Sequence, residues 1–311
     1  MQKIVNVITM GCSKNLVDSE QLMKQLDANH FIVVHDSDNK ADVVIINTCG
    51  FINDAKEESI EKILLYAKER KKKKLEKLFV IGCLSQRWAD ELRKEIPEVD
   101  QYFGTNDLSK ILQALNAEVR RDVMCDRIIT TPRHLAYLKI AEGCNRGCAF
   151  CSIPLIRGPY VSKSEIEILD EAKRLADKGV KEVMVIAQDL SFYGVDSGGK
   201  QLLPSLLDKL TQVDGLEWIR LHYLYPNDFP REILQLMAER EKICKYMDIP
   251  FQHVNDDMLR LMRRGFTREK TYELIDYIRK TVPNIALRTT LLVVQPGDTE
   301  QEFDELMKFE K

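Results

Sequence analysis

The chain has 311 residues, about twice the ~150 residues of an average domain, so we expect two compact domains. Its 44% hydrophobic and 31% charged residues are typical of globular proteins and exclude disordered, collagen-like and low-complexity chains. The 46 Lys and Arg residues are outnumbered by 49 Asp and Glu residues, giving a net charge of -3, which argues against a nucleic-acid binder that relies on overall positive charge.

No targeting or membrane segment is visible in the sequence. Residues 1–10 alternate apolar and polar side chains and lack the charged, apolar and small-residue regions of a signal peptide. The longest aliphatic runs, Val43–Ile46 and Leu291–Val294, are far shorter than the ~20 residues that a membrane helix needs. We therefore expect a cytoplasmic protein, in which grouped cysteines are more often metal ligands or catalytic groups than disulfides.

The first part of the chain alternates β-branched strands with amphipathic helices, which is typical of a parallel sheet. The expected strands are Ile4–Thr9, Ile32–His35, Val43–Ile46 and Leu78–Ile81, and the expected helices lie near 16–28, 54–70 and 86–95. We predict an N-terminal α/β domain over residues 1–120 with an open, doubly wound parallel sheet. A polar stretch without periodicity, residues 121–133, is expected to link it to a second domain.

The second domain, residues 134–311, is expected to be a (βα) barrel with fewer than eight units. Five strands, each followed by an amphipathic stretch, are expected at 135–140, 180–187, 217–224, 246–251 and 285–294. The last of the amphipathic stretches, Thr299–Lys311, shows no helix C-cap and no following strand. We therefore expect a truncated chain and an open, partial barrel.

Three cysteines directly after the first barrel strand form the clearest motif. Cys144, Cys148 and Cys151 stand in AEGCNRGCAFCSIP with the spacing C-x3-C-x2-C, and three thiolates this close can bind one soft-metal centre. A structural zinc site is the alternative, but closed zinc sites take four ligands and no fourth Cys or His lies nearby in the sequence. The motif therefore favours an iron-sulfur cluster bound by three cysteines, with one iron left open.

A second group of three cysteines is spread over the first domain. Cys12, Cys49 and Cys83 each follow the end of a predicted strand, and the carboxyl ends of parallel strands meet at the edge where open α/β folds bind ligands. Three independent buried thiols are the alternative, since free cysteine is a common core residue. The three matching strand exits favour a second cluster. The other two cysteines, Cys125 in the linker and Cys244 at a predicted helix end, have no cysteine neighbours.

The three-cysteine motif after the first strand of a partial barrel resembles the radical S-adenosylmethionine (SAM) superfamily. The resemblance implies that SAM binds the open iron and is cleaved to a 5'-deoxyadenosyl radical that abstracts hydrogen from a carbon. It also implies that polar residues just past the barrel strands contact SAM or the second cluster; the candidates are Gln188, Asp189, Tyr223, Gln252, Arg288 and Thr290. Each of them is equally explained as a polar residue that lines the barrel and makes its hydrogen bonds within the protein. The sequence indicates no catalytic side chain.

The whole chain resembles the methylthiotransferase family, two-cluster radical SAM enzymes that insert sulfur and a methyl group into a C–H bond. The matching motifs are GCSKNLVDSE, NTCGF, IGCLSQR, EGCNRGCAFCSIP and RRGFTREKTYELI, beginning at residues 11, 47, 81, 142 and 263. Where the family's tRNA-modifying branch usually has Gln-Met-Asn after its first cysteine, this chain has Ser13-Lys14-Asn15. That difference indicates the branch that modifies a ribosomal protein.

This branch adds a methylthio group to the β-carbon of an aspartate in small-subunit ribosomal protein S twelve (uS12). The resemblance implies SAM and two 4Fe-4S clusters as cofactors, and a second cluster, on Cys12, Cys49 and Cys83, that holds the sulfur. As partners we expect uS12, in or near the small ribosomal subunit, and a one-electron reductase, and we expect a monomer that acts away from membranes. We expect the family's C-terminal nucleic-acid-binding domain, called TRAM, to be absent from this chain.

Alternatives remain open at this point. A related enzyme would methylthiolate an adenosine of tRNA, and a protein of another class would be a non-enzymatic iron-sulfur electron carrier or scaffold. The family's basic positions are matched by Arg157 and Arg263–Arg264. These arginines could receive an acidic substrate, but structural salt bridges explain them equally well.

Overall fold

The structure, a computed structural model, describes residues 2–310, which divide into two compact units. Unit 1 comprises the chain up to Thr131 together with Leu155–Arg157, and unit 2 comprises Pro132–Pro154 and the chain from Gly158 onward. Across the described residues, no helix is long and apolar enough to cross a membrane.

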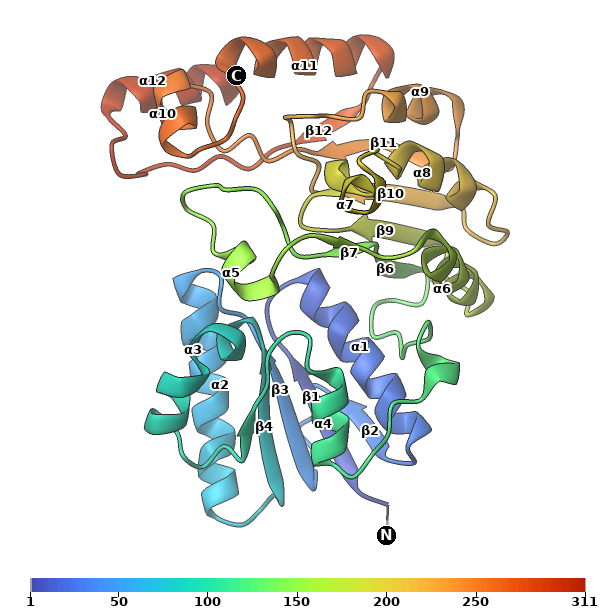
Figure 1. The fold of residues 1–311 in the computed structure, drawn as a ribbon, viewed down its shortest axis with the longest axis vertical. Coiled ribbons are helices and arrows are strands. Elements are labelled where there is room, and N and C mark those ends of the chain that lie inside the picture. Colours follow the sequence, from blue (N-terminus) through green and yellow to red (C-terminus); the bar gives the residue numbers. More distant parts are fainter. Residues whose placement is uncertain (1, 311) are drawn as a thin grey trace. The chain divides into compact units, whose positions relative to one another are not determined.

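Unit 1 is a five-stranded parallel sheet, in the order β2-β1-β3-β4-β5, with helices on both faces (Figure 1). Its strands are β1 (Ile4–Thr9), β2 (Ile32–His35), β3 (Val43–Thr48), β4 (Lys77–Gly82) and β5 (Gln101–Tyr102). Its helices are α1 (Ser13–Ala28), α2 (Asn53–Lys71), α3 (Cys83–Glu95) and α4 (Leu108–Ala114), followed by a 3-10 turn at Arg121–Val123. The expected open parallel α/β sheet is confirmed.

Alternating side chains on the central strand explain why helices cover both faces of this sheet. Val43 and Ile45 of β3 pack with residues of α1 and α4, whereas Val44 and Ile46 pack with residues of α2 and α3. Successive strand side chains point to opposite faces, so an unbroken aliphatic run buries both of them. The strand order reverses direction between β1 and β3, and such switch points are where ligands bind in open α/β sheets.

Unit 2 contains five parallel strands in the order β12-β11-β10-β9-β6, with its helices in an outer layer (Figure 1). The strands are β6 (Leu135–Lys139), β9 (Glu182–Ile186), β10 (Trp218–His222), β11 (Ile243–Asp248) and β12 (Ala286–Arg288). The helices that follow them are α6 (Glu165–Asp177), α7 (Val195–Gly198), α8 (Leu203–Thr211), α9 (Glu232–Glu239), α10 (Asp256–Leu261), α11 (Arg268–Thr281) and α12 (Glu300–Glu310), with a 3-10 turn at Leu190–Phe192. Within residues 2–310 the edge strands β6 and β12 do not pair, so the expected open, partial barrel is confirmed.

A small antiparallel sheet that the sequence did not indicate lies between β6 and α6. The strand β7 (Ala141–Glu142) pairs with β8 (Val161–Ser162), and the short helix α5 (Ile153–Arg157) lies between them in the chain. Two-residue strands have no periodicity that a sequence could display. This pairing brings together the two ends of the segment that carries Cys144, Cys148 and Cys151.

Two barrel strands differ from the sequence-based prediction. Strand β11 begins at Ile243 rather than at residue 246, so Cys244 lies on a strand and not at a helix end. Strand β12 ends at Arg288, whereas a strand over 285–294 was expected. Between β12 and residue 310, only Leu291 makes a further bridge. Val294 has a left-handed backbone with φ 61°, which cannot continue a strand.

Candidate functional site

Three cysteines of unit 1 lie at the carboxyl ends of neighbouring parallel strands. Cys12 follows β1, Cys49 follows β3 and Cys83 follows β4, and these strands are adjacent in the sheet. The switch point between β1 and β3 is the position at which open α/β sheets bind ligands. The structure therefore brings these three predicted cluster ligands to one edge, where Cys49 and Cys83 are buried and Cys12 is exposed.

Cys12 is close enough to the other two thiols to influence the ionisation of Cys49 and Cys83. The pKa of Cys83 is raised to about 11, mainly by burial and to a smaller extent by the charges of Cys12 and Cys49. Burial also raises the pKa of Cys49, with a smaller contribution from Cys12. Thiolates are the metal-binding form of cysteine, so a bound metal centre displaces these protons.

Glycines allow the strand ends to approach one another. Gly11 precedes Cys12 with φ 88°, and a Cβ added to it would lie 2.6 Å from the Cβ of Cys49. Gly82 precedes Cys83 with φ 94°, and a Cβ there would lie 2.3 Å from a side-chain oxygen on β3. Both positions demand glycine for conformation as well as for space. The unit 1 thiols thus share one edge because the residue before two of them has no side chain.

Arg157, at the end of α5, places a positive charge next to the unit 1 thiols. Its guanidinium donates to Asp18 Oδ2 at 2.8 Å and to Asn15 Oδ1, and the residue is 3% exposed. A hydrogen bond to Cys83 and the charge of Arg157 both oppose the rise in the pKa of that thiol, and the charge acts likewise on Cys49. A guanidinium stays protonated in proteins. Of the two roles left open for Arg157, the structure favours internal pairing.

The other three cysteines, Cys144, Cys148 and Cys151, lie in the unit 2 loop between β7 and α5. Backbone hydrogen bonds give this loop its shape: Cys144 N to Gly158 O (3.1 Å), Cys151 N to Cys148 O (3.1 Å) and Ala149 N to Met262 O (3.0 Å). The pKa of Cys144 is raised to about 11, mainly by burial, with the charges of the other two thiols among the smaller causes. The three thiols therefore share one site.

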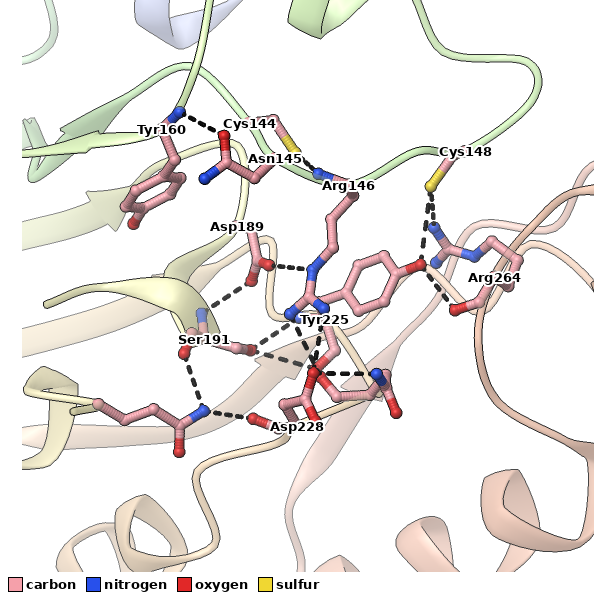
Figure 2. Close-up of polar contacts among 12 residues, drawn as sticks. Cys144, Asn145, Arg146, Cys148, Tyr160, Asp189, Ser191, Tyr225, Asp228 and Arg264 are labelled. Carbon is pink, nitrogen blue, oxygen red and sulfur yellow. Dashed lines mark hydrogen bonds and ion pairs between the residues drawn. The ribbon is translucent and has the colours of Figure 1, made fainter. Parts of the chain in front are cut away.

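Arg146 anchors this loop to other parts of unit 2 through acidic residues (Figure 2). Its Nε donates to Asp189 Oδ2 at 2.8 Å and its Nη1 donates to Asp228 Oδ2 at 3.1 Å. The other oxygen of Asp189 accepts a hydrogen bond from Ser191 N at 2.9 Å, so both oxygens have protein partners. Burial raises the pKa of Asp189, and the charge of Arg146 limits that rise. Asp189, a predicted SAM contact, thus orients the cysteine loop.

Tyr225 and Arg264 connect the rest of unit 2 to Cys148 (Figure 2). The Tyr225 ring centre is 4.2 Å from the guanidinium carbon of Arg146 and 4.4 Å from that of Arg264. The Tyr225 hydroxyl donates to Arg264 O at 2.8 Å and lies 3.6 Å from Cys148 Sγ. Arg264 itself donates from Nη1 to Cys148 Sγ at 3.2 Å. Sequence spacing gave no sign of these contacts, because they join residues far apart in the chain.

Two of the predicted SAM contacts lie beside buried acceptors that lack a hydrogen-bond partner among residues 2–310. Gln188, just past β9, donates from Nε2 to Glu142 Oε1 at 3.3 Å, while its own Oε1 is buried and accepts no hydrogen bond in that range. Arg288 donates to Asp248 Oδ1 at 2.9 Å; Asp248 Oδ2 is buried, accepts no hydrogen bond in that range and lies 3.9 Å from His222 Nδ1. Buried acceptors need donors, and SAM offers an ammonium group and ribose hydroxyls.

The remaining predicted contacts, Tyr223, Gln252 and Thr290, lie at the exits of β10, β11 and β12. Tyr223 and Gln252 have left-handed backbones, with φ 70° and 72°, which is uncommon for residues other than glycine and recurs at functional sites. Gln252 N donates to Thr290 O at 2.9 Å, so these two residues are neighbours. The structure therefore places all three at adjacent strand ends, the face where barrel chemistry occurs.

The six cysteines suit polynuclear centres and not a single metal ion. Within residues 2–310, no three His, Cys, Asp or Glu side chains are arranged to hold one ion. Each thiolate of an iron-sulfur cluster binds its own iron, so the sulfur atoms need not converge on one point. Each group of three contains at least one buried thiol, and both groups therefore fit a cluster.

Comparisons with known proteins cover both units. Residues 4–104 match the Uncharacterized protein family UPF0004, and residues 138–309 match the Radical SAM superfamily. The chain is 52% identical over 309 residues to "Ribosomal protein uS12 methylthiotransferase RimO" of Bacteroides thetaiotaomicron, covering 99% of this chain and 71% of that protein. The protein of the same name from Parabacteroides distasonis is 51% identical over 308 residues, with the same coverage of both chains.

Solved structures show the same fold at low sequence identity. The radical S-adenosylmethionine methyltransferase TsrM from Kitasatospora setae, with cobalamin and a 4Fe-4S cluster bound, superposes with a TM-score of 0.71 at 14% identity, covering 100% of this chain and 73% of that one. The cobalamin-dependent S-adenosylmethionine radical enzyme OxsB gives 0.68 at 12% identity, covering 99% and 52%. From the extent and identity of these matches, the chain belongs to the RimO family of methylthiotransferases, within the radical SAM superfamily.

Proposed function

We propose that this protein adds a methylthio group to the β-carbon of an aspartate in ribosomal protein uS12. The observation that carries the proposal is 52% identity over 309 residues to a protein named as the uS12 methylthiotransferase. The residues after Cys12, which distinguish the ribosomal-protein branch from the tRNA branch, support the same choice of substrate.

In this proposal Cys144, Cys148 and Cys151 hold the cluster that works with SAM. When bound, such a cluster would supply the one-electron reduction of SAM that starts hydrogen abstraction from the substrate carbon. The buried oxygens of Gln188 and Asp248 that accept no hydrogen bond within residues 2–310 would accept hydrogen bonds from the SAM ammonium and hydroxyl groups. The chain's contribution is to hold SAM and the substrate carbon in one orientation.

Cys12, Cys49 and Cys83 would hold the auxiliary cluster, which would supply the sulfur for the methylthio group. Arg157 balances part of the negative charge of these thiolates. We also propose that the protein works in the cytoplasm, because its substrate belongs to the ribosome. We propose further that it is a monomer and that a one-electron reductase supplies its electrons.

The test is anaerobic reconstitution of the chain with iron and sulfide, followed by incubation with uS12, SAM and a one-electron reductant. We expect 5'-deoxyadenosine in solution and one methylthio group on a single aspartate of uS12. Mass spectrometry detects the first product and locates the modified aspartate. The variant with Cys144, Cys148 and Cys151 all changed to Ala is the matched control, and it should form neither product.

Other outcomes would assign a different function. Methylthiolation of tRNA adenosine with unmodified uS12 would identify the tRNA enzyme and reject the proposed substrate. A protein that binds both clusters but never forms 5'-deoxyadenosine would be an electron carrier or scaffold.

A further inference from the structure

Arg264 is a buried cation whose side chain points at a predicted cluster ligand (Figure 2). The residue is 4% exposed, and its Nη1 donates to Cys148 Sγ at 3.2 Å. Its Nη2 donates to the carbonyl of Pro250. The guanidinium is therefore fixed between a backbone oxygen and a sulfur atom.

Aromatic rings and a backbone carbonyl of unit 2 hold Arg264 in this position. Its guanidinium carbon lies 4.4 Å from the centre of the Tyr225 ring and 5.5 Å from that of Phe266. The Tyr225 hydroxyl donates to the Arg264 carbonyl at 2.8 Å. Aromatic faces attract a guanidinium but do not neutralise its charge. Packing thus positions a full positive charge beside the thiol of Cys148.

Arg264 differs from the other two arginines near the cysteines in having no acidic partner. Arg146 pairs with two carboxylates, and Arg157 pairs with Asp18. Arg264 has none within residues 2–310, and its Nε is buried without any hydrogen-bond partner. A buried charge without a counter-ion is costly. Of its two hydrogen-bond partners, Cys148 is the one that can carry a balancing negative charge, when its sulfur binds a metal centre as a thiolate.

We infer that Arg264 stabilises the reduced state of the cluster held by Cys144, Cys148 and Cys151, by donating a hydrogen bond to the sulfur of Cys148. The inference rests on the proposed assignment of a cluster to these cysteines. Reduction adds one negative charge, so a fixed cation hydrogen-bonded to a ligand sulfur favours the reduced form over the oxidised form. Arg264 is in this sense a positioning and tuning residue and not a catalytic one, since it acts through Cys148.

The test is a redox titration of the full chain with both clusters, followed by electron paramagnetic resonance of the reduced clusters. The signal of the cluster on Cys144, Cys148 and Cys151 is identified as the one that changes when SAM is added. At the potential where half of the unmodified protein's cluster is reduced, we expect Arg264→Gln to lower the ratio of reduced to oxidised cluster at least tenfold. A tenfold change corresponds to a midpoint about 59 mV lower for a one-electron couple.

Two further variants separate charge from packing. Arg264→Lys keeps the positive charge and should keep most of the reduced fraction. Arg263→Gln is the matched control, because Arg263 carries the same charge in the next position but is exposed; its midpoint should equal that of the unmodified protein.

Each remaining outcome counts against one idea. The inference is rejected if Arg264→Gln and Arg263→Gln, at equal iron content, have ratios of reduced to oxidised cluster within twofold of each other. Loss of the cluster from both Arg264→Gln and Arg264→Lys also rejects it, because the side chain would then be needed for packing alone. If the unmodified chain holds iron but shows no signal that responds to SAM, the proposed function is rejected, and with it the inference that rests on it.

Discussion

At the scale of single residues, each group of three thiols has a guanidinium next to it. In unit 1 this is Arg157, which shares its hydrogen bonds between Asn15, Asp18 and Cys83. A hydrogen bond from a charged donor contributes about 1.5–3 kcal/mol, more than a neutral one. Removal of Arg157 should therefore weaken the hold of these thiolates on a cluster without disturbing the core of the sheet.

Arg157→Gln is expected to release iron from the unit 1 cluster about tenfold faster than the unmodified protein in the presence of a chelator, because about 1.4 kcal/mol corresponds to a factor of ten. The measurement is iron release with time in a variant whose Cys144, Cys148 and Cys151 are Ala, so that only the unit 1 cluster contributes. Arg93→Gln, which removes an exposed arginine on α3, is the control. Equal release rates for the two variants would show that the Arg157 charge does not act on the cluster.

Sequence reasoning identified the cysteines but not their partners, for a physical reason. A spacing such as C-x3-C-x2-C is local, and strand exits can be recognised from aliphatic runs, so both sets of thiols were predictable. Arg157 and Arg264 were noticed only as basic positions. Their roles depend on contacts with residues 142 and 116 positions away along the chain, and no local pattern records such contacts.

At the scale of elements, the first two turns of α1 hold the strand ends of unit 1 together. Asn15 donates to Met10 O at 2.9 Å and to Thr48 O at 3.0 Å, which links the exits of β1 and β3. The amide of Asn47 donates to Ser19 Oγ at 2.9 Å. The segment GCSKNLVDSE, first noted as a family motif, is therefore also the structural element that fixes where Cys12 and Cys49 lie.

The same helix is bound to the chain after residue 120 by a buried ion pair. Arg127 Nη1 donates to Glu20 Oε2 at 2.6 Å, both side chains are 2% exposed, and Thr130 N donates to Glu20 Oε1 at 2.7 Å. Removing one member of a buried pair leaves a charge without its partner. Such changes cost about 3–5 kcal/mol.

Glu20→Ala is therefore expected to lower the free energy of unfolding of unit 1 by about 3–5 kcal/mol, measured by urea unfolding. Glu91→Ala, at an exposed position of α3, is the control and should change stability by less than about 0.5 kcal/mol. Adding Arg127→Met to Glu20→Ala should restore part of the loss, because the unpaired charge is removed. A loss no larger than that of the control would mean that the pair does not stabilise the unit.

The order and type of the long elements were predictable, and the exceptions are short. All strands of four or more residues come from continuous aliphatic or alternating segments. By contrast β5, β7 and β8 have two residues each, too few for a pattern to show. The early end of β12 at Arg288 follows from backbone conformations beyond it, such as the left-handed Val294, that the aliphatic sequence of 291–294 conceals.

At the scale of the whole molecule, the six cysteines divide between two compact units that each contain a complete set of three. If each set binds a cluster independently, the variant with Cys144, Cys148 and Cys151 changed to Ala should retain about four irons per chain where the unmodified protein has about eight. The reciprocal variant at Cys12, Cys49 and Cys83 should also retain about four, and Cys244→Ala should retain all. Iron and sulfide analysis after anaerobic reconstitution provides the measurement.

The two variants also test the assignments separately. Complete loss of iron from the first variant would mean that Cys12, Cys49 and Cys83 do not form a site of their own. Retention of all the iron would mean that the unit 2 cysteines bind none.

The contact between Arg264 and Cys148 has a consequence for the order of events during synthesis. The three cysteines of the unit 2 loop leave the ribosome more than a hundred residues before Arg264 does, since 116 positions separate Arg264 from Cys148. The backbone bond from Ala149 to Met262 is missing for the same interval. During that time the loop has reactive thiols but not the partners that shape it. Until translation has passed the segment after β11, the thiols of this loop lack these contacts, and we expect them to be more open to oxidation than in the complete chain.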